Sequence, residues 1–112
     1  MNVVLHCSSG SDDDQRHALA NARNLLADDT VDLESVAFVA NGDAVWLLVE
    51  GSAHADAVAD LDGAVDFYAC SNSLRTREIS TDDLLAGVEP GSSGVGTVSK
   101  LQESGYRYIK VP

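Results

Sequence analysis

The sequence predicts an α/β protein in which helices cover both faces of a mainly parallel sheet. Apolar, strand-like runs alternate along the chain with amphipathic, helix-like segments in the order β-α-β-α-α-β-α-α-β. The connections between these segments are short, as they are where helices link neighbouring parallel strands. A length of 112 residues is enough for one domain with a hydrophobic core and too small for two. We therefore expect a single domain over residues 1–112.

The N-terminal strand and helix are each marked by a simple pattern. Residues Val3–Cys7 form a short apolar run that predicts the first strand, and turn residues follow it. Ser11 is an N-cap residue type, and the helix that it begins extends over Asp12–Ala27 with apolar residues at helical spacing. Three aspartates fill the first turn of this helix, where negative charge complements the helix dipole. They favour a solvated helix start over a metal site.

The next apolar segments predict a buried strand and a short helix. The stretch Asp32–Ala40 ends in a near-continuous apolar run of the kind that is buried on both faces in a parallel sheet. Residues 44–49 fit either a strand or a helix, and we favour a helix because Asp43 can cap it and Gly51 can end it. This segment is apolar almost all round. Trp46 therefore either packs inside the protein or marks a contact between subunits.

The second half of the chain continues the alternation of helices and strands. An amphipathic helix precedes a strand rich in aromatic and β-branched residues, and a last capped helix leads into the C-terminal strand. The expected elements are a helix over Ala53–Leu61, a strand from Val65 to Cys70, a helix that begins at Ser71 or Asn72, a capped turn over Ser80–Leu85, an extended piece within Gly87–Gly91, a helix capped by Ser92 or Ser93 and ended by Gly105, and a strand over Tyr106–Lys110. All of them fit one covered sheet.

A cysteine at the end of the aromatic strand is the leading candidate for chemistry. Ser71 and Asn72, directly after Cys70, are N-cap residue types, so the thiol is expected at the junction of a strand and a helix. Unpaired backbone N–H groups and the positive end of the helix dipole favour thiolate over thiol there. Arg75 and Arg77 add positive potential if they fold back toward the sulfur. The pattern predicts an exposed, reactive cysteine, and the alternative is a buried apolar filler.

Polar and thiol groups near the ends of the first two strands predict the wall of a binding crevice. Ligands of open α/β sheets bind outside the carboxyl ends of the strands, where Cys7, Ser9 and Asn41 are expected. If the second strand lies between the first and third, Cys7 and Cys70 are roughly 10 Å apart, too far for a disulfide. The two cysteines match no zinc pattern, and no glycine-rich nucleotide motif occurs. We therefore expect no metal and no cofactor, and interpret Cys7 as a filler or a wall residue.

The charge of the chain limits its partners. Eighteen acidic residues stand against seven basic ones, which gives a formal net charge of −11. Such a surface repels phosphate backbones, so nucleic-acid binding is not expected. No apolar run approaches the ~20 residues that span a bilayer, and the N-terminus lacks the pattern of a signal peptide. We therefore expect a cytoplasmic protein without membrane contact.

Five stretches of the sequence carry a resemblance to a known family. They are residues 38–42 (FVANG), 65–74 (VDFYACSNSL), 82–88 (DDLLAGV), 93–95 (SGV) and 101–110 (LQESGYRYIK). In this order they resemble the DsrE/DsrF-like family of small sulfur-relay proteins. The resemblance implies a five-stranded, mainly parallel, three-layer α/β/α domain of DsrEFH-like fold, layered as in flavodoxin-like and Rossmann-like proteins. It further implies a trimer or hexamer of like subunits, with a persulfide on a cysteine at the position of Cys70.

A persulfide carrier needs a thiolate that accepts sulfane sulfur and hydrogen-bond donors that hold the anion. We expect the backbone amides of Ser71 and Asn72, together with Arg75, to supply those donors. The leading hypothesis is a sulfurtransferase-like homo-oligomer that passes sulfur from Cys70 to a sulfur-carrier protein. One alternative is a non-catalytic oligomer that binds a small anion or metabolite in the same crevice. Another is a structural subunit anchored through Trp46, Leu47 and the last strand.

The acidic, lysine-poor composition also predicts adaptation to high intracellular salt. Screening in concentrated KCl removes much of the repulsion among carboxylates, so we expect the protein to become less stable as salt is lowered. Thermal unfolding followed by circular dichroism at about 0.1 M and about 2 M KCl measures this, with the higher melting temperature expected in the concentrated salt. A melting temperature that is indifferent to KCl contradicts the adaptation.

Overall fold

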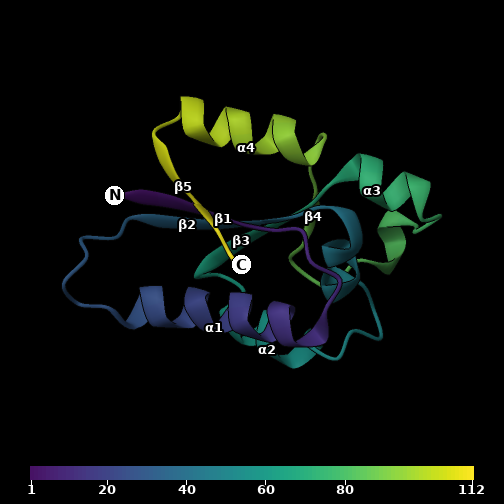
Figure 1. Cartoon of the computed structure of the whole chain (residues 1–112), viewed down its shortest axis with the longest axis horizontal. Coiled ribbons are helices and arrows are strands. Elements are labelled where there is room, and N and C mark those ends of the chain that lie inside the picture. Colours follow the sequence, from purple (N-terminus) through teal and green to yellow (C-terminus); the bar gives the residue numbers. More distant parts are fainter.

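Five parallel strands form one sheet in the order β4-β3-β2-β1-β5 (Figure 1). The computed structural model describes residues 1–112. Its strands are β1 (Asn2–Cys7), β2 (Ser35–Ala40), β3 (Val65–Ala69), β4 (Glu89–Pro90) and β5 (Tyr106–Lys110). Every pair of neighbouring strands is parallel. The predicted α/β class and the five-stranded sheet are confirmed.

Helices cover both faces of this sheet. They are α1 (Asp12–Ala27), α2 (Ala55–Leu61), α3 (Ser71–Thr76) and α4 (Gly94–Glu103), together with the 3-10 helices η1 (Gly42–Leu48) and η2 (Thr81–Asp83). In Figure 1, α1 and α2 lie against one face, α4 lies against the other, and α3 lies beyond one end of the sheet. None of the helices is both long and apolar enough to cross a bilayer.

The first helix has the bounds that its sequence predicts. Ser11 is the N-cap, and its hydroxyl oxygen accepts a hydrogen bond from the Asp14 N–H at 3.3 Å. Arg16 pairs with Asp12 at 2.6 Å and with Asp13 at 2.8 Å on the exposed surface of the helix. The aspartates of the first turn therefore serve the helix start, as the dipole argument predicts.

Alternation along the strands divides the apolar side chains into two layers. The larger layer faces α1 and α2 and includes Phe38 and Phe67, whose ring centroids are 5.4 Å apart. Leu5, Phe38 and Phe67 lie opposite one another in the register of β1, β2 and β3. A smaller layer packs beneath α4 and consists of Val4, Ala37, Val39 and Val98. Both faces are thus closed by side chains that the strand pattern predicts to be buried.

The segment after β2 differs from its prediction. A short helix over 44–49 is expected, and the structure instead has the 3-10 helix η1, which begins at Gly42 with φ +58°. Four apolar residues of η1 are buried, whereas Trp46 is 48% exposed. The alternative in which Trp46 packs inside the protein is therefore wrong. A 3-10 helix fits here because its tighter turn suits a short connector of this kind.

Truncation of the central aromatic pair is expected to destabilise the fold strongly. Phe67→Ala removes a ring that is 1% exposed and packs on Phe38, and such truncations cost about 3–5 kcal/mol of unfolding free energy. Urea denaturation followed by circular dichroism measures the loss. The matched control is Asp66→Ala, one residue away on the opposite face and exposed, which should change the free energy by less than about 0.5 kcal/mol. Equal effects of the two substitutions would contradict the assigned register.

Candidate active site at Cys70

Cys70 lies directly after β3 and is itself the N-cap of α3. Its backbone is extended, with φ −60° and ψ 120°, and its Sγ accepts a hydrogen bond from the Ser73 N–H at 3.4 Å. The sequence predicts Ser71 or Asn72 as the cap, and this is wrong because the thiol sulfur takes that role. Ser71 is instead the first helical residue. The sulfur therefore lies at the N-terminus of α3, as the strand-to-helix junction predicts.

A second helix also begins at this sulfur. The Gly94 N–H, in the first residue of α4, donates a hydrogen bond to Cys70 Sγ at 3.1 Å. The Ser71 N–H donates to the Ser92 carbonyl at 3.1 Å, and the Ser71 hydroxyl donates to the Gly91 carbonyl. These bonds join the start of α3 to the loop that precedes α4. The sulfur consequently receives N–H groups from two helix N-termini, where the positive ends of both helix dipoles favour an anion.

The pKa values of the two cysteine thiols are shifted in opposite directions. Burial raises the pKa of the Cys70 thiol, but the combined hydrogen bonds from the Ser73 hydroxyl and from the backbone N–H groups of Ser73, Gly94 and Asn72 outweigh burial and lower the pKa below its usual value. Burial raises the pKa of the Cys7 thiol above its usual value, and only weaker effects oppose it. Cys70 is therefore the more acidic of the two thiols.

The predicted exposure of Cys70 is wrong, because the residue is 5% exposed. The start of α4 closes over it at Gly94. A Cβ placed on Gly94 would lie 2.9 Å from Asn41 Cβ and 3.5 Å from Cys70 Cβ, so a larger residue would push the helix away. Sequence reasoning missed Gly94 as a site residue. The available signal was a glycine in the first turn of a helix, where it weakens the helix and indicates a close approach.

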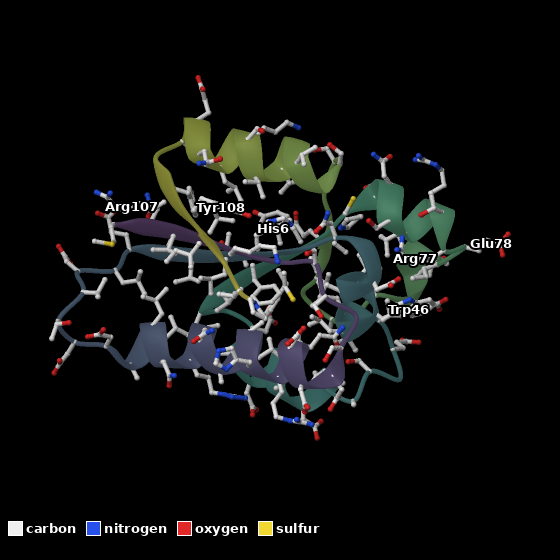
Figure 2. All side chains as sticks on the ribbon, viewed as in Figure 1. His6, Trp46, Arg77, Glu78, Arg107 and Tyr108 are labelled. Carbon is white, nitrogen blue, oxygen red and sulfur yellow. The ribbon has the colours of Figure 1, made fainter.

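The two arginines do not fold back onto the sulfur. Arg75 donates a hydrogen bond to Asn72 Oδ1 at 2.9 Å on the surface of α3. Arg77, labelled in Figure 2, pairs with the Asp43 carboxylate at 3.0 Å. The donors around the sulfur are thus the backbone N–H groups of Ser73, Gly94 and Asn72 and the Ser73 hydroxyl. The predicted donation by Ser71 N–H and by Arg75 is wrong, because Ser71 N–H bonds to the Ser92 carbonyl and Arg75 bonds to Asn72.

The structure brings Asn41 to the thiol but keeps the other predicted wall residues apart from it. Asn41 follows β2, directly beside Cys70 after β3, and both contact the position of Gly94. Ser9 donates its hydroxyl to the Asp14 carboxylate at 2.6 Å and so belongs to the start of α1. Cys7 is fully buried, both cysteines are free, and β2 separates their strands as expected. Of the two roles predicted for Cys7, a filler or a wall residue, its full burial favours the filler.

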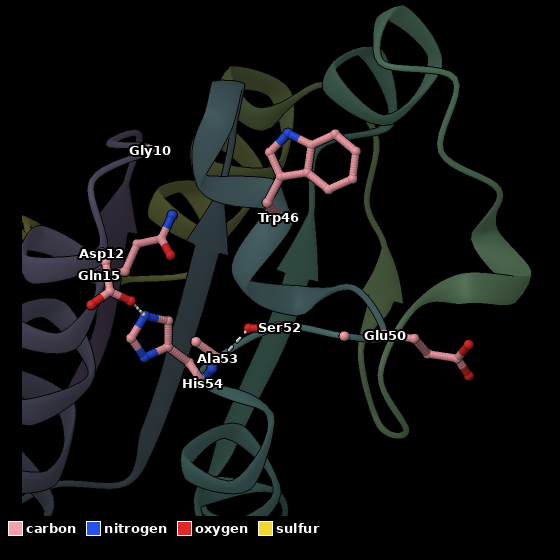
Figure 3. Close-up of a pocket in the computed structure, with 9 residues that line it drawn as sticks. Gly10, Asp12, Gln15, Trp46, Glu50, Ser52, Ala53 and His54 are labelled. Atoms are coloured by element: carbon pink, nitrogen blue, oxygen red, sulfur yellow. Dashed lines mark hydrogen bonds and ion pairs between the residues drawn. The ribbon is translucent and has the colours of Figure 1, made fainter.

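The cavity drawn in Figure 3 lies away from the thiol. It has a volume of about 310 Å³ and is lined by residues that include Trp46, Gln15 and His54. The His54 ring points to Asp12, with Nε2 and the carboxylate oxygen 2.9 Å apart. None of the four cavities is lined by Cys70. No group of three or more His, Cys, Asp or Glu side chains is placed to hold a metal ion.

Comparison with known proteins identifies the family of this protein. The model of the DsrE/DsrF-like family matches residues 1–111. The chain belongs to the DsrE/DsrF-like family. A DsrE-like protein of similar structure is MTH1491 of Methanobacterium thermoautotrophicum, described as a protein of unknown function, with 35% identity over 97% of each chain and a TM-score of 0.90. The ychN protein of E. coli shares the fold, with 18% identity, coverage of 98% of this chain and 99% of its own, and a TM-score of 0.81. No curated protein matches this DsrE-like chain.

Substitution of Gly94 is expected to make Cys70 less acidic. In Gly94→Ala the new Cβ meets Asn41 Cβ, so α4 has to move away and the hydrogen bond from Gly94 N–H to the sulfur weakens. The pKa of the Cys70 thiol should rise, and overpacking should cost about 1–3 kcal/mol of stability. The pH dependence of alkylation by iodoacetamide, followed by mass spectrometry of the Cys70 peptide, measures the pKa.

The control for this substitution is Val95→Ala, because Val95 is the next residue of α4 and is largely exposed. It should leave the alkylation profile of Cys70 unchanged. Cys7 serves as an internal reference in every sample and should react only after unfolding, because it is fully buried and its pKa is raised. A Gly94→Ala protein that is folded and keeps the original profile would show that Gly94 does not set the acidity of Cys70.

Proposed function

We propose that this protein is a sulfur carrier that holds sulfane sulfur as a persulfide on Cys70. The observation that carries the proposal is the pair of backbone N–H groups, from Ser73 and Gly94, that donate to one sulfur at 3.4 Å and 3.1 Å. They stabilise a thiolate, which is the form that attacks sulfur. Membership of the DsrE/DsrF-like family, whose fold is related to sulfur relay, supports the same chemistry.

The proposed reaction exchanges one sulfur–sulfur bond for another. The Cys70 thiolate attacks the outer sulfur of a donor persulfide, R–S–SH. A bond forms between Cys70 Sγ and that sulfur while the donor bond breaks, and the donor leaves as the thiolate R–S⁻. An acceptor thiolate then attacks the outer sulfur of the Cys70 persulfide and releases Cys70 as a thiolate. The two exchanges consume no external oxidant or reductant.

The burial of Cys70 indicates what kind of sulfur donor and acceptor this protein uses. Because only 5% of Cys70 is exposed, the proposed donor and acceptor are proteins that dock over this residue. Proteins of this family are generally oligomeric, and we propose a homo-oligomer, either a trimer or a hexamer, for this chain. The proposed place of action is the cytoplasm, where thiols remain reduced. Neither a metal nor an organic cofactor takes part.

The N–H groups of Ser73 and Gly94 also suit a second candidate, a non-catalytic protein that binds a small anion beside Cys70. In that case Cys70 is only part of a wall, and Cys70→Ala should keep the stabilisation that the anion provides. Thermal shift measurements with inorganic sulfide, sulfite and thiosulfate, on the original protein and on Cys70→Ala, separate the two candidates. Stabilisation that survives the substitution favours binding, and persulfide formation on Cys70 without stabilisation by these anions favours relay.

The direct test of the carrier function is the formation of the persulfide itself. Incubation with a persulfide donor should add the mass of one sulfur atom to the Cys70 peptide, as read by mass spectrometry under non-reducing conditions. Cys70→Ser should lose this adduct completely. The matched variant Cys7→Ser should keep it, because Cys7 is fully buried and its pKa is raised. A folded protein that acquires no added sulfur on Cys70 rules out the carrier function.

A further inference from the structure

A chain of hydrogen bonds connects the edge of the sheet to the neighbourhood of Cys70. The Tyr108 hydroxyl on β5 lies 2.7 Å from His6 Nδ1 on β1, and His6 Nε2 lies 2.7 Å from Asn41 Oδ1 after β2. Figure 2 shows His6 and Tyr108 next to each other between the sheet and α4. The two residues also line an open groove of about 260 Å³ beside α4. These hydrogen bonds thus connect β5, β1 and the end of β2 on the face of the sheet that α4 covers.

These bonds fix which end of the Asn41 amide is free. Oδ1 is an acceptor only, so the hydrogen of the imidazole is on His6 Nε2. The other ring nitrogen, Nδ1, shares a hydrogen bond with the Tyr108 hydroxyl. Asn41 Oδ1 bonds to His6. The two N–H groups of Asn41 Nδ2 have no hydrogen-bond partner elsewhere in the protein. The arrangement therefore presents an oriented, unused donor group.

The residue that carries this donor group is a neighbour of Cys70, since a Cβ placed on Gly94 would lie 3.4 Å from Asn41 Cγ and 3.5 Å from Cys70 Cβ. Asn41 and Cys70 both contact the position of Gly94, and the Cys70 N–H donates to the Ala40 carbonyl at 2.9 Å. The groups that lower the pKa of the Cys70 thiol are Ser73, Gly94 and Asn72, and Asn41 is not among them. A second sulfur bound to Sγ extends beyond the donors that hold Sγ itself. Asn41 is the neighbouring side chain with N–H groups to spare.

We propose that the Tyr108–His6–Asn41 chain positions the Asn41 amide as a hydrogen-bond donor to the outer sulfur of a persulfide on Cys70. The inference rests on the proposed carrier function and names the residues that stabilise its loaded state. His6 and Tyr108 act through Asn41 and are positioning residues. The thiolate and the persulfide are then held by different donors: backbone amides hold Sγ, and the oriented side chain holds the sulfur in transit.

The test compares the thiol and the persulfide in the same set of variants. Asn41→Ala removes the donor, and His6→Ala releases its orientation. Loss of a hydrogen bond to a charged sulfur should shorten the lifetime of the Cys70 persulfide by about tenfold in Asn41→Ala, with a smaller effect in His6→Ala. His6→Gln, which keeps a side-chain N–H for Oδ1, should restore part of the lifetime. Tyr108→Phe should shorten the persulfide lifetime no more than His6→Gln does.

The measurements are the decay of the sulfur adduct by mass spectrometry and the alkylation pKa of the unloaded Cys70 thiol. We expect the thiol pKa to stay unchanged in all variants, which a general disturbance of the fold would not allow. The matched control is Ser99→Ala, which lines the same groove and bonds only to the Val95 carbonyl. It should change neither quantity.

The outcomes separate this inference from the function on which it rests. If the original protein forms no persulfide, the carrier function fails and the inference fails with it. If the original protein is loaded normally and Asn41→Ala keeps the full persulfide lifetime, only the inference is overturned. A thiol pKa that shifts together with the lifetime also overturns it, because Asn41 would then act on Sγ.

Discussion

The site depends on the approach of two helix starts to one sulfur atom. α3 begins at Cys70, and α4 begins with Gly94, whose N–H reaches the same sulfur at 3.1 Å. The Ser71 N–H and hydroxyl fasten the loop before α4 to α3, so neither helix start is free to move alone. Burial opposes a charge at this place, and the hydrogen bonds outweigh it. Backbone N–H groups and the Ser73 hydroxyl thus do here what a side-chain base or a cation does at other reactive cysteines.

The strand alternation distributes the chemistry between the two faces of the sheet. Cys7 ends β1 on the face covered by α1, where it is sealed in the larger apolar layer. His6, one residue earlier, faces α4 and reaches Asn41. The parallel register places β5, β1 and the end of β2 side by side, so Tyr108, His6 and Asn41 form one polar row. A shift of one residue in any of these strands would exchange the polar row for the apolar layer.

Local signals predicted much of the fold, and contacts between distant segments account for the rest. The helix Asp12–Ala27 and the strand Tyr106–Lys110 have the predicted bounds, because caps and strand-forming residues lie within the elements themselves. The position of Cys70 at a strand-to-helix junction could be predicted for the same reason. Its burial could not, since Gly94 covers it from 24 residues away. The sequence also suggested that Arg75 and Arg77 reach the sulfur. In the structure Arg75 bonds to Asn72 and Arg77 pairs with Asp43 instead.

The shared hydrogen bonds at Cys70 have a consequence for the chain before it is fully folded. One of the two backbone bonds comes from its own helix, and the other comes from a segment that must first wrap across the opposite side of the sheet. A molecule in which α4 is not yet packed on the sheet lacks the hydrogen bond from Gly94 N–H, and its Cys70 thiol is less acidic than in the folded protein. Part of the acidity at this position therefore arises only when the tertiary structure is complete.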